Sequence, residues 1–133
     1  MHRGKLFLAV FALALVPAEF TAQQQAQGAV TAEIVIATGV ESREPVGGAA
    51  QFPADVGELY GWTKVTGASN TTVQHVWRYQ DHELVVPVSI GGSPWRAWST
   101  KNIPPEWTGE WTFEVRDASG VVVASVTFTV GTP

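Results

Sequence analysis

An alternation of apolar and polar side chains along the C-terminal part of the chain constrains the fold most strongly. Residues 108–117 place Trp111 and its apolar neighbours at every second position, and residues 121–130 do the same around Phe128. A period of two is that of a β-strand with one buried face. Residues 117–120 between them end in glycine, which suits a short hairpin loop. The pattern therefore predicts two antiparallel strands that lie next to each other.

Five further segments have the length and the β-branched or aromatic content of strands: residues 30–38, 58–66, 71–80, 83–90 and 95–100. Pro87 cannot donate a ladder hydrogen bond, which predicts an edge strand at residues 83–90. Residues 42–56 are interrupted by prolines and glycines and predict an irregular loop anchored by Phe52. Because no helical period is present, we predict an all-β fold, an antiparallel immunoglobulin-like β-sandwich of about seven strands.

The N-terminus predicts export. A basic start is followed by an apolar run over residues 6–16, which is too short to span a bilayer and is typical of a signal peptide. We predict cleavage after Ala18, which gives a signal peptide (1–18), a flexible tether (19–29) and one β-sandwich domain (30–133). A signal that is retained as a membrane anchor is the alternative. No later segment is apolar for long enough to cross a membrane, so the domain is expected to be secreted or periplasmic.

Charge and composition limit which partners and cofactors can be expected. Removal of residues 1–18 takes Arg3 and Lys5 from the 8 basic residues and leaves 6 against 12 acidic residues, and such an acidic domain is a poor partner for nucleic acid. The chain has no cysteine, so burial alone must hold the fold together. The two remaining histidines, His75 and His82, have opposite predicted strand parities, so neither a metal site nor another cofactor is expected.

Several short blocks of the sequence occur in a fixed order. They are His75-Val76-Trp77, the run SPWRAWSTK at residues 93–101, Gly109-Glu110-Trp111 and the predicted hairpin at residues 117–130. With these blocks, residues 45–130 resemble the bacterial Domain of Unknown Function 2914 family. The resemblance implies a small exported or envelope-associated β-domain. The family brings no established activity, cofactor or catalytic residue that could be carried over to this chain.

All six tryptophans lie within residues 62–111, together with several basic residues. Alternation predicts Trp77 and Trp111 in the core, whereas Trp95 and Trp98 have opposite parity, so one of them should reach the surface. An exposed indole beside a cation could stack on a sugar ring and bond its polar groups. The candidate ligand-binding residues are therefore Trp95, Arg96, Trp98, Lys101, Trp107 and His75.

Structural roles are the alternative for the same residues. His75 could hold a backbone carbonyl or a hydroxyl group at the margin of the core. Arg96 and Lys101 could pair with Glu106 and Glu110 and so fasten the loop before the next strand to the sheet.

No catalytic residue is predicted. The chain lacks a GxSxG nucleophile motif, and Ser99 with Lys101 is a serine–lysine pair with no helix to orient it. The expected function is that of a non-catalytic interaction or accessory module of the bacterial cell envelope, with an envelope protein or a glycan as partner. The first alternative is a carbohydrate-binding module that uses an aromatic and cationic surface patch. The second is a small envelope hydrolase that recruits two carboxylates.

Overall fold

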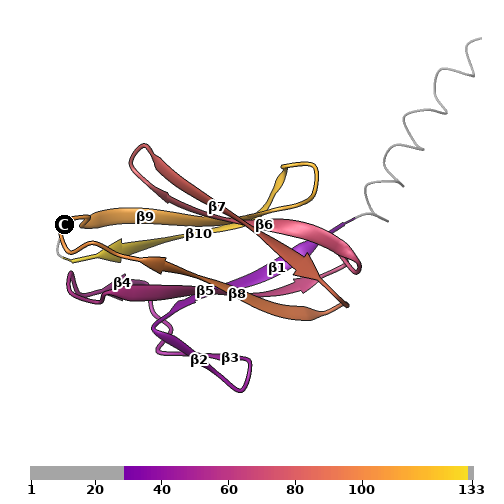
Figure 1. The fold of residues 1–133 in the computed structure, drawn as a ribbon, viewed down its shortest axis with the longest axis horizontal. Helices are drawn as coiled ribbons and strands as arrows, with labels where there is room; N and C mark the ends of the chain where they lie inside the picture. Colours follow the sequence, from indigo (N-terminus) through magenta and orange to yellow (C-terminus); the bar gives the residue numbers. More distant parts are fainter. Residues whose placement is uncertain (1–28, 132–133) are drawn as a thin grey trace, which may run out of the picture.

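The computed structural model describes residues 29–131, and the predicted signal peptide, its cleavage site and the tether up to residue 28 lie outside this range. The described residues form ten strands and no helix (Figure 1): β1 (Thr31–Ala37), β2 (Gly39–Glu41), β3 (Glu44–Val46), β4 (Gln51–Phe52), β5 (Glu58–Thr66), β6 (Thr71–Tyr79), β7 (His82–Ile90), β8 (Trp95–Asn102), β9 (Gly109–Arg116) and β10 (Val122–Val130). Nothing in this range thus has the length and hydropathy of a membrane-spanning helix. Each of the seven predicted strands is present.

The long strands form two packed sheets, which Figure 1 shows as two layers. One sheet has the order β1-β5-β8 and the other β4-β10-β9-β6-β7, and all neighbours are antiparallel except β4 with β10. In an immunoglobulin-like sandwich, β1, β5 and β8 correspond to strands A, B and E, and β6, β9 and β10 to C, F and G. The predicted fold class is confirmed, and β7, with Pro87, is an edge strand as expected.

The segment predicted as an irregular loop, residues 42–56, is more regular than its sequence suggests. β2 and β3 form a hairpin, and β4 pairs with the end of β10, so the loop prediction is wrong for these strands. The turn of the hairpin holds Ser42 and Arg43 with φ of 51° and 66°. A type I′ turn requires positive φ at both central positions, and these positions are usually occupied by glycine or asparagine. Phe52 is buried, as predicted for the anchor of this segment.

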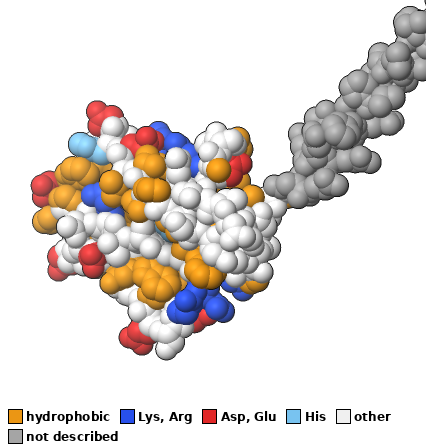
Figure 2. All heavy atoms as spheres, turned by 45° about the vertical axis from the view of Figure 1, so that its right-hand side comes forward, with side chains coloured by type: hydrophobic (Ala, Val, Ile, Leu, Met, Phe, Trp, Pro, Cys, Tyr) orange, Lys and Arg blue, Asp and Glu red, His pale blue; other side chains and the backbone are white. Residues whose placement is uncertain are grey.

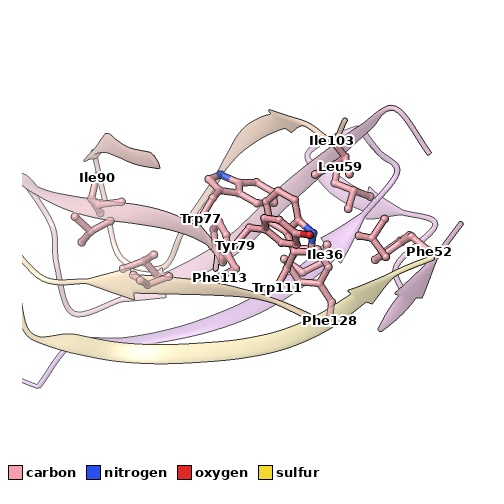
Figure 3. Packing of buried hydrophobic residues seen from close by; sticks show 14 of the residues in the cluster. Ile36, Phe52, Leu59, Trp77, Tyr79, Ile90, Ile103, Trp111, Phe113 and Phe128 are labelled. Atoms are coloured by element: carbon pink, nitrogen blue, oxygen red, sulfur yellow. The ribbon is translucent and has the colours of Figure 1, made fainter. Parts of the chain in front are cut away.

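Hydrophobic side chains reach the surface in separate areas (Figure 2), whereas large aromatic residues fill the space between the sheets (Figure 3). Trp77 and Trp111 are each 1% exposed, which confirms their predicted place in the core. The rings of Trp77 and Phe113 meet edge to face, with 4.8 Å between centroids. Gly61 on β5 lies so close to Phe113 that a Cβ there would overlap the ring. This contact joins the strands that a disulfide joins in antibody domains.

Candidate functional site

The candidate residues of β8 alternate between its two faces. Trp95 and Lys101 have the parity of the buried Ser99, whereas Arg96 and Trp98 have the opposite parity. Trp95 packs against the core cluster, and Trp98 is 39% exposed. Trp98 is therefore the tryptophan of this strand that reaches the surface, and the predicted patch is divided between two faces of one sheet.

Trp98 lies on the outer face of the three-stranded sheet, opposite Trp62 in the register of β5 and β8. The β2–β3 hairpin covers Trp62, whose indole Nε1 donates to the carbonyl oxygen of Arg43 at 2.9 Å. The same hairpin supplies Glu44, whose Oε2 lies 2.9 Å from Arg96 Nε as an ion pair without hydrogen-bond geometry. Arg96 thus pairs with the hairpin and not, as predicted, with the loop before β9. The outer face presents an exposed indole beside an arginine that is already neutralised.

Trp95 closes one corner of the sandwich, next to the turn between β7 and β8. A Cβ on Gly91 would come within 2.9 Å of its indole ring, so the glycine allows the ring to lie flat against the turn. The guanidinium of Arg43 lies 5.5 Å from the ring centroid, which is a cation–π contact. Trp95 thus packs against the turn and against Arg43 of the same chain.

His75 lies in the middle of the core and has no exposed surface. Its Nε2 is 3.1 Å from Thr63 Oγ1, its Nδ1 is 2.8 Å from Ser99 Oγ, and the Trp77 indole donates to the same serine oxygen at 3.1 Å. Burial lowers the pKa of His75 from 6.5 to about 4, because a charged ring would lose its hydration there. The structure gives His75 hydroxyl partners, as in its structural alternative, and places it deep in the core rather than at its margin.

Lys101 and Trp107 lie together at a pocket of about 230 Å³, which we call the aromatic pocket. Its walls come from β6, β7, the end of β8, the loop before β9, and β9 itself. The lining residues are Trp77, Tyr79, His82, Glu83, Leu84, Lys101, Trp107 and Trp111. Because β7 and β8 are edge strands of the two sheets, the pocket opens on a side of the sandwich that no further described strand covers.

Four rings of the aromatic pocket pack on one another. Trp107 is nearly parallel to Tyr79, with 5.2 Å between centroids and 10° between planes, and it stacks on His82 at 4.2 Å. Tyr79 also contacts Trp111, at 4.8 Å. The Tyr79 hydroxyl donates to the carbonyl oxygen of Thr108 at 2.8 Å, and Trp111 Nε1 donates to that of Trp107 at 3.1 Å. These bonds tie the loop before β9 to the sheet and hold the rings in position.

Lys101 supplies the positive charge of the pocket. Its Nζ lies 5.3 Å from the ring centroid of Trp107 and 5.8 Å from that of Trp111, and it donates to a backbone carbonyl at 2.9 Å. Within residues 29–131, no carboxylate oxygen lies within 4 Å of this ammonium group. The ion pairs predicted for Lys101, with Glu106 or Glu110, are therefore wrong, and the lysine contacts aromatic faces instead.

Tyr79 and His82 were not among the predicted site residues, because the predicted position of one turn is wrong. Asp81 and His82 were expected between the strands, whereas the turn consists of Gln80, with φ of 52°, and Asp81, so that His82 pairs directly with Tyr79. Directly paired residues of neighbouring strands point to the same face. His75 and His82 therefore share the inner face of their sheet, and the opposite parity predicted for them is wrong. An aromatic residue just before a two-residue turn was the signal that could have revealed this.

The aromatic pocket offers the chemistry of binding: ring faces for stacking, one ammonium group and one carboxylate at its rim. The described part of the chain contains no group of three or more His, Asp or Glu side chains placed to hold a metal ion. Ser99, which the sequence grouped with Lys101, has its hydroxyl inside the core, between His75 and Trp77. Of the six candidate residues, the structure brings only Lys101 and Trp107 together at this pocket.

The chain also matches a known family. Residues 70–130 match the family model described as "Protein of unknown function (DUF2914)". The matched segment runs from the start of β6 to the end of β10. The family predicted from the sequence is confirmed, although the match begins at residue 70 and not at residue 45. All lining residues of the aromatic pocket lie within the matched DUF2914 segment.

No curated protein matches the chain. Among solved structures, a selenomethionine-labelled β-glucosidase from Kluyveromyces marxianus is similar over 57% of this chain and 13% of its own, with 11% sequence identity and a TM-score of 0.37. The chain thus spans only a small part of the length of that enzyme, and a similarity of this size carries no inference about activity.

Proposed function

We propose that this DUF2914 protein is a non-catalytic binding module, exported to the bacterial cell envelope, that recognises an envelope glycan or protein through the aromatic pocket. The proposed export rests on the basic start and the apolar run of the N-terminus. The proposed recognition rests on one observation. Stacked aromatic rings and one lysine line a pocket of about 230 Å³ in the side of the sandwich, next to the packed core.

The pocket is suited to binding because its rings are held in place before a ligand arrives. Tyr79 and Trp111 are 7% and 1% exposed and are fixed by hydrogen bonds, while Trp107 remains partly exposed. A ligand that covers the exposed part of Trp107 removes apolar surface from water, which contributes about 25 cal/mol per Å². Since the neighbouring rings are already ordered, binding costs little further side-chain entropy.

The proposal is tested by comparing Trp107→Ala with Trp98→Ala, which removes an indole from the outer face of the three-stranded sheet, outside the pocket. The unchanged protein and both variants are applied to a glycan array and used for pull-down from envelope extract. We expect Trp107→Ala to lose the partner that the unchanged protein binds, and Trp98→Ala to retain it. Full binding by a Trp107→Ala variant whose circular dichroism is unchanged would show that the pocket is not the binding site.

A carbohydrate-binding surface around Trp98 is the second candidate, because this indole is 39% exposed on a sheet face, beside Arg96. Aromatic faces at the surface can stack on sugar rings. The same experiment distinguishes the two candidates. Loss of glycan binding in Trp98→Ala, with binding kept in Trp107→Ala, would favour the outer face.

Export is tested separately. We expect the protein from an expressing bacterium in the periplasmic or secreted fraction, with Glu19 as its first residue, because cleavage is predicted after Ala18. Mass spectrometry of the fractionated protein identifies this terminus. Uncleaved protein in the membrane fraction would favour the retained anchor instead.

A further inference from the structure

We infer that the aromatic pocket takes a six-membered ring that carries a carboxylate, with the chemistry of a single uronic-acid residue, and that this carboxylate lies against the Lys101 ammonium group. The inference rests on the proposed function, since it names the ligand class of the same pocket. The size of the pocket, its charge and the arrangement of its rings each lead to this ligand.

The size of the pocket fits one ring. The pocket has a volume of about 230 Å³. Pockets for drug-sized molecules have volumes of about 300 to 1,000 Å³. One six-membered ring with its substituents therefore fits, and any further ring of a glycan chain would extend out of the open side.

The charge of the pocket favours an anion. Lys101 is the only lysine or arginine of the lining, and no carboxylate within residues 29–131 pairs with it. The lining carboxylate, Glu83, is held by two arginines, since its Oε2 lies 2.7 Å from Arg78 and 3.4 Å from Arg116. Glu114 lies 2.8 Å from Arg116, so these two arginines and two glutamates balance one another. The ammonium group of Lys101 therefore sets the charge that a ligand meets, although the domain as a whole is acidic.

The arrangement of the rings favours a ligand with a flat apolar side. Trp107 and Tyr79 are stacked, within 10° of parallel and with 5.2 Å between centroids, so the partly exposed Trp107 ring is the flat wall that a ligand can reach. Pyranose rings present their C–H groups to such a wall, while their polar substituents point outward from the edge of the ring. Because Lys101 Nζ lies 5.3 Å from the centroid of the Trp107 ring, it is within reach of a carboxylate on a ligand stacked there. A charge-assisted hydrogen bond would then fix the orientation of the ligand.

Sodium D-glucuronate is the probe for this inference, and D-glucose is its neutral counterpart. Each is titrated into ¹⁵N-labelled protein, and the indole N–H signals of Trp107 and Trp111 are followed by NMR. Lys101→Met removes the charge but keeps the apolar stem, and Lys64→Met removes the same charge from the outer face of the same three-stranded sheet. We expect glucuronate to shift both indole signals. We expect binding to be about tenfold weaker or more for glucose and for Lys101→Met, and unchanged for Lys64→Met.

Three results would overturn the inference: no shift of the indole signals by glucuronate, equal affinity for glucose, or undiminished glucuronate binding by Lys101→Met. Benzoate tests whether the pocket prefers a sugar ring, because it carries its carboxylate on a planar aromatic ring instead. Benzoate binding that is tighter than glucuronate binding would also overturn the assignment to a uronic acid. None of these results bears on the proposed function, which fails only when Trp107→Ala keeps its envelope partner.

Discussion

The hydrogen bonds around His75 leave no place for a second proton on its ring. Thr63 donates its hydroxyl proton to the carbonyl oxygen of Ala97 at 3.0 Å, so it accepts a hydrogen bond from His75 Nε2–H. Nδ1 then accepts the hydroxyl proton of Ser99, whose oxygen accepts the Trp77 indole N–H. A proton on Nδ1 would break the bond from Ser99 and would place a charge where the ring has no exposed surface. The folded state therefore strongly favours a neutral His75.

The sign and the size of the pH effect follow from the lowered pKa of His75. The unfolded chain binds a proton at this residue below about pH 6.5, whereas the folded protein does so only near pH 4. The stability that comes from keeping His75 neutral is thus fully present above about pH 6.5, and it is lost as the pH falls towards 4. The contribution of His75 to the free energy of unfolding should fall by about 1.3 kcal/mol between about pH 7.5 and about pH 5.5. By about pH 4.5 the loss should reach roughly 2.5 kcal/mol.

Urea unfolding followed by tryptophan fluorescence measures this change. We expect the free energy of unfolding of the unchanged protein to fall with pH more steeply than that of His75→Gln, which cannot bind the proton. The difference between the two curves isolates His75 from the carboxylates, since these titrate in both proteins. His82→Gln is the matched control, because the His82 side chain is 55% exposed, and it should keep the steep curve. Parallel curves for His75→Gln and the unchanged protein would refute the account of a buried, neutral His75 ring.

Two further pairs of variants test the packing of the core by the same unfolding measurement. Trp111→Ala should lower the free energy of unfolding by about 3–5 kcal/mol, since Trp111 is 1% exposed, whereas Trp98→Ala should cost about 1 kcal/mol or less. A large loss of stability in Trp98→Ala would mean that this indole supports the fold. Gly61→Ala should cost about 1–3 kcal/mol, because its Cβ would overlap the ring of Phe113, and Gly39→Ala should change little, because nothing lies within 4 Å of its added methyl group. Equal effects at the two glycines would contradict the close contact.

The strands and their order along the chain could be predicted from the sequence because each depends on local properties. A period of two, together with Gly120 and Pro87, determined two hairpin strands and one edge strand. Their opposite parity on one strand likewise places Trp95 and Trp98 on different faces of β8. It could not say which of them is exposed, since that depends on which face of β8 meets the second sheet.

The aromatic pocket could not be predicted, because it depends on contacts between distant segments. Lys101 and Trp107 were identified as a possible site, but their partners Tyr79 and His82 come from the β6–β7 hairpin. A shift of the turn by one residue reverses the face on which His82 lies. The turn at Gln80 and the β2–β3 turn both use non-glycine residues with positive φ, which leave a weak signal in the sequence.

Because the chain has no cysteine, packed side chains hold the two sheets together, and some of these side chains also line the aromatic pocket. In antibody domains a disulfide joins strands B and F beside a buried tryptophan of strand C. Here Gly61 on β5 and Phe113 on β9 meet at that position, and Trp77 on β6 packs against Phe113. Packing of this kind acts only in the folded state, whereas a disulfide also restricts the unfolded chain. Trp77 and Trp111 belong to this packed core and also line the aromatic pocket, so a ligand that binds there must stabilise the whole domain. At about ten times its Kd, such a ligand should add about 1.4 kcal/mol to the free energy of unfolding, and a thermal shift can therefore identify it without knowledge of its activity.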